Sequence, residues 1–557
     1  MPVDLDCDIC RRAGQIHSVG PERQNLIREL SFQWIYTILF RDVNTVVTRR
    51  RIHQYRTYSY RRTCPTTPKS PNCGTARKPI QANARKRFCW SSRGTREAPL
   101  PEKNMENVMS EQSQPSRREF IATGSAVAAT LAASPGLSHG AYAGGSDLLK
   151  LGLIGCGGRG TGAASQALNA DSGVELVAMA DAFEDRLNSS RERLERQFNK
   201  NDFNRVNVPE ENRFVGFDAY QKVIDNTDIV CLTSTPHFRP RHLKAAVEAG
   251  KHVFCEKPVA VDAPGLRSVM ESVEKARQNK TALVSGLCWR YHHGKRAVFD
   301  QLKEGLIGDI VSMQCSYMTG GVWDPRKTKE QCKTEMEYQL RNWYYYTWLS
   351  GDFNVEQHIH SLDKMLWAMG DKPPSTISAS GGRQVRTDPK YGNIYDHFNV
   401  VYEWENEVEV PKKDGSTKKE KRPGVKAYAR CRHWKNCEND VNDYIFGTKG
   451  RMDVMKHRAF DLDGNEIWKF EGNGGDMYQI EHDELFASIR GANPINNGDY
   501  MCKSTMLAIS GRMAAYTGEK LTWEQAMNSV EDLTPDAYEW GDVPVPSVAI
   551  PGRTKFS

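Results

Sequence analysis

Four glycines between residues 155 and 160 have the spacing of a dinucleotide-binding turn. The segment GCGGRG matches the pattern GxGxxG and directly follows a short apolar run at residues 149–154. In such a turn the first glycine allows the tight bend, the second lets backbone amides approach a pyrophosphate, and the third lets helix and strand pack closely. The N-terminus of the following helix favours the phosphate charge. The pattern predicts a dinucleotide site formed by Gly155, Gly157, Gly158, Arg159 and Gly160.

An acidic residue, Asp181, ends the next apolar run, 21 residues after Gly160. A carboxylate at this position accepts hydrogen bonds from both ribose hydroxyls and repels a 2′-phosphate. NAD is therefore the expected cofactor and NADP is less favoured, although Arg186 is close enough in the sequence to weaken the distinction. The alternative is a structural glycine turn that binds no ligand.

Two later apolar runs end in residues that suit a ligand crevice. One is followed by Thr235 and Pro236, and the other by Glu256 and Lys257. Ligands of doubly wound sheets bind outside the carboxyl ends of the strands, so we expect these residues beside the cofactor, with Lys257 pointing toward the nicotinamide. An ammonium group next to a carbonyl or alkoxide oxygen polarises it and assists proton transfer. The alternative for Lys257 is a surface lysine in a turn.

Apolar runs and helical stretches alternate through the segment that contains these motifs. The runs begin near residues 149, 174, 228, 252 and 281, with helix-like segments between them. Alternating strands and helices predict the α/β class, with a parallel, doubly wound Rossmann sheet. We assign this predicted domain to residues 147–290.

Beyond residue 290 the alternation stops. Strand-like runs follow from residue 309, separated by turn signals, with one strong helix among them. This pattern predicts an α+β domain with a mostly antiparallel sheet that covers a helix, over residues 291–520. A charged segment from Glu409 is interpreted as a solvated hairpin tip. Helices at 478–490 and 504–516 are expected to pack on the first domain, and residues 521–557 form a C-terminal tail.

The N-terminal 104 residues differ from the rest in charge. They hold 20 Lys and Arg against 8 Asp and Glu, whereas the other 453 residues hold 56 against 61. The basic balance belongs to this leader, so it gives no reason to expect a nucleic-acid partner. We interpret residues 1–104 as disordered, or as sequence that precedes a true start at Met105 or Met109.

Paired arginines mark the segment 105–146. Arg117 and Arg118 precede a 13-residue apolar run, and Ala141-Tyr142-Ala143 follows it. This pattern is typical of a twin-arginine (Tat) export signal with its cleavage site. The apolar run is too short to cross a hydrocarbon core. We therefore expect a periplasmic protein without stable membrane association; an alanine-rich first helix is the alternative.

From about residue 149 to its end, the chain resembles the Gfo/Idh/MocA oxidoreductases, the group of glucose-fructose oxidoreductase and inositol dehydrogenase. The resemblance rests on GCGGRG, ADAF, AGKHVFCEKP, GLIGDI, GDFNVEQHIHSLDKMLW and the region of Arg290. It implies that the lysine of the EKP sequence is catalytic and that a later motif, Asp-x-Gly-x-His-x-x-Asp, faces the substrate. Here His360 and Asp363 match that motif, whereas Glu356 replaces its first Asp and His358 replaces its Gly.

Helical geometry supports this alignment of the later motif. At about 100° per residue, Glu356, His360 and Asp363 fall on one stripe, and His358 points to the opposite side. A carboxylate four residues from an imidazole orients it and tunes its pKa, which suits a general base. We therefore predict that His360 and Glu356 are catalytic. The alternatives are a salt-bridged core helix and a metal pair of histidines; the i, i+2 spacing argues against the metal, and none is expected.

An aromatic run precedes this motif. Trp343 and its neighbours in WYYYTW suit stacking on the apolar faces of sugar rings, although such residues are also ordinary core material. The family likeness implies that Arg290, Tyr291 and Asp363 also contact the substrate. The expected partner is a small carbohydrate or polyol.

These parts predict oxidation of a secondary hydroxyl. His360, oriented by Glu356 or Asp363, would take the hydroxyl proton, Lys257 would stabilise the alkoxide, and the hydride would pass to NAD. An exported protein must carry its nucleotide from the cytoplasm, so we expect NAD to be tightly held and regenerated in place. The alternatives are an NAD-dependent glycoside hydrolase that oxidises its substrate transiently, and a non-catalytic sugar-binding relative. By analogy, the open sheet predicts a homo-oligomer.

Overall fold

The computed structural model describes residues 147–557 apart from residues 201–202 and 413–415. The predicted leader and export signal fall on residues 1–146, so both lie outside the described residues. Within the part of the chain that is described, no helix has the length and apolar character needed to cross a bilayer.

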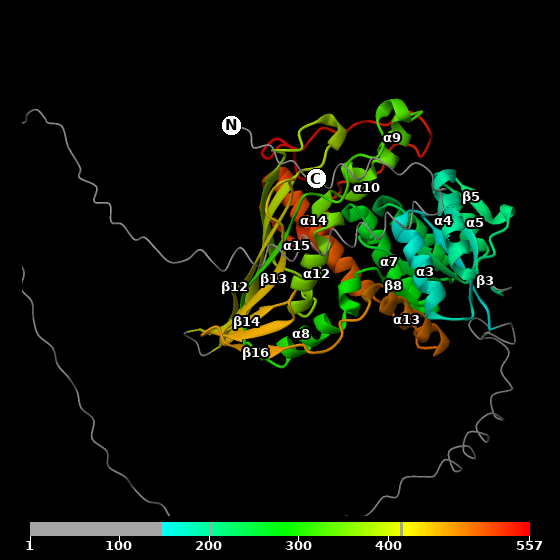
Figure 1. Ribbon diagram of the computed structural model, residues 1–557. Helices are drawn as coiled ribbons and strands as arrows, with labels where there is room; N and C mark the ends of the chain where they lie inside the picture. Colours follow the sequence, from blue (N-terminus) through cyan, green and yellow to red (C-terminus); the bar gives the residue numbers. More distant parts are fainter. Residues whose placement is uncertain (1–146, 201–202, 413–415) are drawn as a thin grey trace, which may run out of the picture. The chain divides into compact units, whose positions relative to one another are not determined.

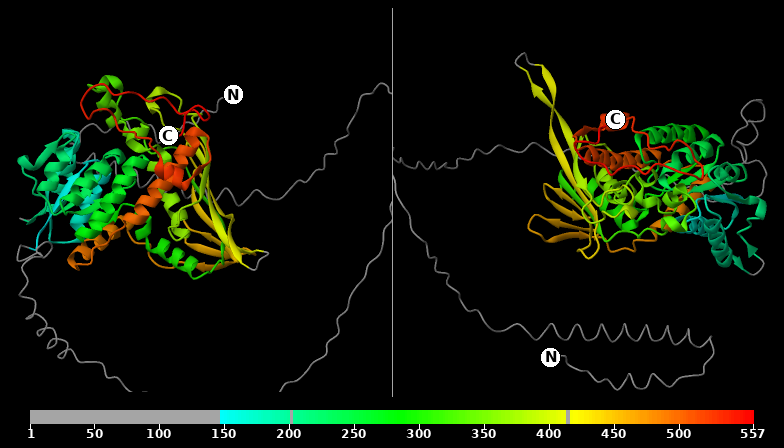
Figure 2. Two further views of the ribbon diagram at one scale, coloured as in Figure 1. Left: turned by 180° about the vertical axis from the view of Figure 1, so that it is seen from behind. Right: turned by 90° about the horizontal axis from the view of Figure 1, so that it is seen from above.

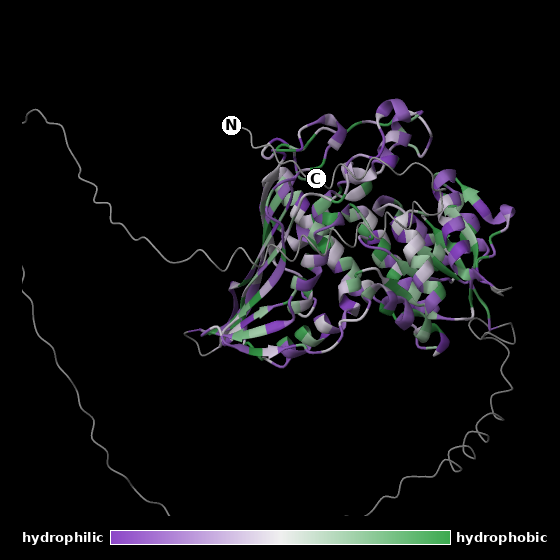
Figure 3. Ribbon diagram, viewed as in Figure 1, coloured by the Kyte–Doolittle hydropathy of each residue, from purple (hydrophilic) through white to green (hydrophobic). Residues whose placement is uncertain are grey.

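Six parallel strands form the first sheet, in the order β5-β2-β1-β6-β7-β8. Its two edge strands, β5 and β8, are labelled in Figure 1. The strands β1, β6, β7 and β8 are almost wholly buried, as expected for a parallel sheet covered on both faces. Figure 3 shows the hydrophobic colouring of this core. The predicted doubly wound sheet is confirmed. Its strands are β1 (Leu149–Ile154), β2 (Val174–Asp181), β5 (Arg213–Val215), β6 (Ile229–Leu232), β7 (His252–Cys255) and β8 (Leu283–Ser285).

The winding of this sheet reverses at β1. β2 pairs with one edge of β1 and β6 pairs with the other. Ligand crevices of such sheets lie at this switch point, outside the carboxyl ends of the strands. The glycine turn follows β1 and therefore lies at the crevice. The connecting helices are α3 (Gly158–Ala170), α4 (Glu184–Phe198), α5 (Ala219–Asp225), α6 (Arg239–Glu248) and α7 (Ala263–Asn279).

Nine strands form the second sheet, in the order β16-β15-β14-β13-β9-β12-β11-β10-β17. β9 and β12 pair in parallel and the other neighbours pair antiparallel, which confirms the predicted mostly antiparallel sheet. The strands are β9 (Ile310–Thr319), β10 (Thr376–Gly382), β11 (His397–Pro411), β12 (Thr417–His433), β13 (Asp440–Gly447), β14 (Gly450–Asp453), β15 (Arg458–Asp461), β16 (Glu466–Lys469) and β17 (Leu521–Thr522).

Helices of the second domain join the two sheets. α14 (Gly498–Thr517) packs on β10 and β11 and also on α7, and α12 (Ile359–Ala368) packs on α14 and β9 (Figure 1). α13 (Met477–Arg490) packs on α3, beside the glycine turn. The other helices are α8 (His293–Lys303), α9 (Glu335–Arg341), α10 (Thr347–Ser350), α11 (Phe353–Glu356) and α15 (Trp523–Asn528).

The charged segment from Glu409 continues two strands. β11 and β12 stay paired as far as Pro411 and Thr417, beyond the residues that pair with their other neighbours (Figure 2). Cross-strand ion pairs such as Lys419 with Glu407, at 3.1 Å, border this extension. Strand pairing therefore extends further into the predicted hairpin than the charged sequence suggested.

Candidate active site

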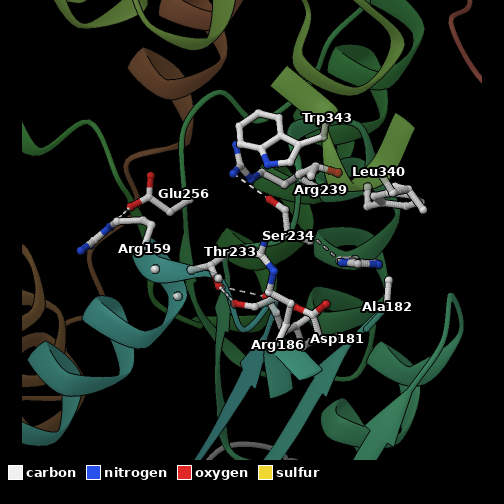
Figure 4. A pocket seen from close by; sticks show the side chains of 18 of the residues that line it. Arg159, Asp181, Ala182, Arg186, Thr233, Ser234, Arg239, Glu256, Leu340 and Trp343 are labelled. Atoms are coloured by element: carbon white, nitrogen blue, oxygen red, sulfur yellow. Dashed lines mark hydrogen bonds and ion pairs between the residues drawn. The ribbon is translucent and has the colours of Figure 1, made fainter. Parts of the chain in front are cut away.

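A cavity of about 520 Å³ is lined by residues that follow β1, β2, β6 and β7 and by residues of the second domain (Figure 4). It lies where the switch point of the first sheet predicts a crevice. Twelve of the residues predicted from the sequence to bind cofactor or substrate or to act in catalysis line it: Gly155, Gly157, Gly158, Arg159, Gly160, Asp181, Thr235, Glu256, Lys257, Trp343, Glu356 and His360.

The glycine turn forms a cradle with one open side. Gly155 has a φ of +97°, and a Cβ at this position would collide with the backbone of Ser234. A Cβ on Gly160 would collide with the carbonyl oxygen of Gly155. A Cβ on Gly157 or Gly158 would instead meet nothing within 4 Å, and both residues line the cavity. The open side therefore lets a ligand approach the backbone, which fits a pyrophosphate.

Asp181 is fixed beside this turn by backbone amides. Its Oδ2 accepts a hydrogen bond from Cys156 N at 2.6 Å, and its Oδ1 accepts one from Phe183 N at 2.9 Å. Burial raises the pKa of Asp181 despite these hydrogen bonds. Arg186 lines the same wall (Figure 4). This end of the cavity thus offers an acceptor for ribose hydroxyls and a guanidinium that suits a phosphate.

Arg159 connects the turn to two glutamates from distant parts of the chain. It forms ion pairs with Glu256 after β7 and with Glu481 Oε1 in α13, the latter at 3.0 Å. Burial raises the pKa of Glu256, but the charges of Arg159 and its neighbours outweigh that effect and lower the pKa overall. A Cβ on Gly286 would lie 2.8 Å from the Glu256 carboxyl carbon, so the glycine leaves room for that carboxylate. The ion pairs fix the turn relative to the end of β7.

Lys257 meets the second domain across the cavity. Its Nζ donates to the Oε1 of Glu356 at 3.0 Å and to the Glu356 carbonyl oxygen at 2.5 Å. The two side chains are only 11% and 13% exposed. Glu356, predicted as the partner of His360, is therefore an ion-pair partner of Lys257.

His360 lines the cavity as a buried imidazole. Burial, and next the charge of Lys257, hold the pKa of His360 well below its ordinary value, so the ring is neutral at pH 7. Its Nδ1 is buried without a hydrogen-bond partner in the described part of the chain. The expectation that Glu356 or Asp363 orients this ring is thus corrected. A neutral imidazole still has the lone pair that a general base needs.

A break in the helix explains this difference. α11 ends at Glu356 and α12 begins at Ile359, so the predicted common helical stripe does not form. His358, at the break, faces the interior: its Nδ1 lies 3.1 Å from Asn354 Oδ1 and its Nε2 lies 3.6 Å from the sulfur of Cys315. His358 does not line the cavity.

Three residues predicted to bind substrate lie away from the cavity. Arg290 donates to Asp363 through Nε at 2.9 Å and pairs with Asp371 at 2.6 Å. The hydroxyl of Tyr291 donates to Asn497 at 2.7 Å. These buried contacts hold elements of the structure together, and none of the three residues lines the cavity.

Some residues that line the cavity were not predicted from the sequence. Pro236, which was predicted to lie beside the cofactor, is buried and does not line the cavity. Arg239, at the start of α6, lines it. Arg239 Nη2 donates to the Ser234 carbonyl oxygen at 2.7 Å. Arg239 could have been predicted from the sequence, because it follows closely after Thr235, beyond the carboxyl end of a strand. The other residues that were not predicted have no such signal. They are Phe183, Gly216, Phe217, Val322, Arg326, Leu340 in α9, Gln357 and Tyr478 at the start of α13.

Buried histidines predict that the fold loses stability in mild acid. Burial lowers the pKa of His237 to about 4 and the pKa values of His242, His358 and His433 to about 3. Their folded pKa values lie below the unfolded value of about 6.5, so their stabilisation is complete above that pH. It falls below that pH by about 1.4 kcal/mol per pH unit for each histidine. Asp352, whose pKa burial raises to about 7, and Glu481, whose pKa burial raises well above its ordinary value, oppose this trend. We expect the thermal unfolding temperature to fall steadily from pH 6.5 to pH 5; a constant or rising value would contradict the burial of these rings.

The fold and the cradle define a protein with a parallel Rossmann sheet, of the kind that binds dinucleotides, followed by a mostly antiparallel sheet. Residues 149–286 match the family model described as "Oxidoreductase family, NAD-binding Rossmann fold". The match covers the domain that carries the glycine turn, Asp181 and Lys257.

Curated relatives are similar over part of their length. An uncharacterized oxidoreductase of Streptococcus pneumoniae is 25% identical over 182 residues, 33% of this chain and 44% of the relative. A 2,7-anhydro-N-acetylneuraminate hydratase of Escherichia coli is 23% identical over 205 residues, which cover 36% of this chain and 50% of the relative. An inositol 2-dehydrogenase of Serratia proteamaculans is 33% identical over 126 residues, which cover 21% of this chain and 36% of the relative. The chain thus spans about half, or less, of the length of these relatives.

A solved structure extends the similarity of fold to the second domain. The aldose-aldose oxidoreductase from Caulobacter crescentus, complexed with glycerol, aligns with a TM-score of 0.50 and 19% identity, over 67% of this chain and 99% of that one. At this identity the alignment establishes a shared fold.

Proposed function

We propose that this chain is an NAD-dependent oxidoreductase that acts on a secondary hydroxyl of a sugar or polyol. One observation carries the proposal: Lys257, from the first domain, and His360, from the second, line the same cavity as the glycine cradle. The family match and the inositol and aldose oxidoreductases among the similar proteins support this class of substrate.

The residues of the cavity have different roles in the proposed reaction. When bound, the nicotinamide supplies the carbon that accepts or returns a hydride. Neutral His360 takes the hydroxyl proton of the substrate, while the Lys257 ammonium stabilises negative charge on the substrate oxygen. Glu356 holds that ammonium in place through its carboxylate and its carbonyl oxygen. Trp343 offers an aromatic face to the substrate.

The cradle and Asp181 suit the cofactor. Gly157 and Gly158 would hold the pyrophosphate, and Asp181 would accept hydrogen bonds from the ribose, which favours NAD over NADP. Arg186 and Arg326 line the same end of the cavity, so binding of both dinucleotides should be measured.

A hydrolytic alternative is favoured by one finding. The hydratase among the relatives adds water to a sugar-like substrate according to its name, so a redox-neutral reaction on this fold is a second candidate. In such a reaction the same two residues would move a proton during transient oxidation of the sugar.

Assays of the cofactor and of the reaction, on the purified full chain, test the proposal. Mass spectrometry after denaturation, together with binding of added NAD and NADP, reports the cofactor; a fold indifferent to both would refute the proposal. Absorbance at 340 nm with a panel of sugars and polyols reports reduction of the dinucleotide, bound or free. Release of nitrophenol from nitrophenyl glycosides, without net reduction, would favour the hydrolytic alternative.

A further inference from the structure

One end of the cavity, near Asp181, is walled by both domains. Phe183 and Phe217 contribute from the ends of β2 and β5, and the segment 322–340 contributes Val322, Arg326 and Leu340. Figure 4 shows Leu340 and Ala182 at this end of the cavity. If the glycine cradle holds a pyrophosphate and Asp181 a ribose, the adenosine occupies this end.

A forked ion pair fastens the second domain over this end. The Nη1 and Nη2 atoms of Arg341 donate to the two carboxylate oxygens of Asp185 in α4, both at 2.8 Å. The Arg341 guanidinium also lies 3.7 Å from the centroid of the Phe183 ring. Forked arginine–carboxylate pairs are geometrically specific, and stacking on an aromatic ring adds to their strength. Arg341 thus reaches the wall of the cavity from outside.

The C-terminal tail covers the same two phenylalanines. The centroid of the Trp540 ring lies 5.4 Å from the centroid of the Phe183 ring and 4.8 Å from that of the Phe217 ring. The tail is also bound to α9, because Met336 N donates to the carbonyl oxygen of Gly541 at 3.0 Å. The tail and α9 therefore cover one wall together.

Both flanks of Trp540 are anchored. Before it, the hydroxyl of Tyr538 lies 2.8 Å from Nε2 of His237, in the first domain. After it, Gly552 N donates to the carbonyl oxygen of Thr517 at 2.8 Å, at the end of α14. The tail is thus a strap attached to both domains.

We propose that Arg341, Asp185 and Trp540 form a clamp that retains the dinucleotide between turnovers. The proposal rests on the proposed function, because it assigns the adenosine to this end of the cavity. Release would require Arg341 to leave Asp185 and the tail to leave Phe183 and Phe217. The clamp lies on the outer side of the wall, so it affects how long a ligand stays and leaves the chemistry at Lys257 and His360 unchanged.

The release rate of NADH tests the clamp directly. The full chain is loaded with NADH, mixed with a large excess of NAD, and followed by the fluorescence of bound NADH. We expect Arg341→Ala and Trp540→Ala each to release NADH at least ten times faster than the unmodified protein. Arg296→Ala is the matched control: it removes another forked pair, Arg296 with Glu484, which borders no part of the cavity, and its release rate should stay within twofold.

A charge exchange distinguishes the loss of this ion pair from a general loss of folding. Asp185→Arg combined with Arg341→Asp should release NADH more slowly than either single change. Equal release rates in all proteins that bind NADH would overturn the clamp while leaving the proposed function intact. Failure of every protein to bind NADH or NADPH would refute the proposed function itself.

Discussion

Replacing Lys257 by methionine should lower turnover by about 10²- to 10⁴-fold, the usual range for a group that assists proton transfer. Methionine keeps an apolar stem of similar length and removes the charge that would stabilise the substrate oxygen. The affinity for NAD should change little, because the cradle and Asp181 lie at a different part of the cavity. Steady-state kinetics and equilibrium NAD binding measure the two effects separately. Lys303→Met, at the exposed end of α8, is the control.

The same variant should change the pH dependence of any remaining activity. After burial, the charge of Lys257 is the next cause that holds the pKa of His360 low, so removing that charge should raise it. A base with a raised pKa becomes protonated at a higher pH, and the acid limb of kcat/KM should therefore shift upward. Unchanged turnover, or an acid limb that does not move, would exclude the proposed interplay of these two residues.

Gly155→Ala should abolish tight NAD binding. The backbone at Gly155 has a φ of +97°, and the added methyl group would collide with the backbone of Ser234 and the carbonyl carbon of Thr233. Backbone cannot move aside as a flexible side chain does, so the turn must shift away from β6 and the cradle must change shape. We expect the Kd for NAD to rise by at least 100-fold, measured by calorimetry.

Gly250→Ala is the matched control for this change. Gly250 also has a positive φ, +70°, but a Cβ there would meet nothing within 4 Å. Both variants carry the conformational cost of alanine in the left-handed region, about 1 kcal/mol, and only Gly155→Ala adds a collision. Equal NAD affinity in the two variants would contradict the role assigned to the glycine turn.

The local parts of the site could be predicted from the sequence. The glycine turn, Asp181 and Lys257 all follow apolar runs of a single βαβ alternation, and strand order in such a sheet brings their carboxyl ends to one edge. The periodicity of the chain was enough to predict both sheets because hydrophobic patterning depends on residues near one another in sequence. The roles assigned to individual site residues stay predictions.

The tertiary structure decided which distant groups meet. A helical stripe placed Glu356 with His360, but the chain breaks between α11 and α12, and Glu356 binds Lys257, 99 residues away. Arg159 pairs with Glu481, and Arg341 crosses to Asp185 in the other domain. Periodicity carries no information on such pairings, because a charged side chain takes whichever opposite charge the packing of whole elements brings within reach. The sequence by itself determined the fold class and the glycine turn, and the packing of the second domain and the tail determined how the cavity is closed.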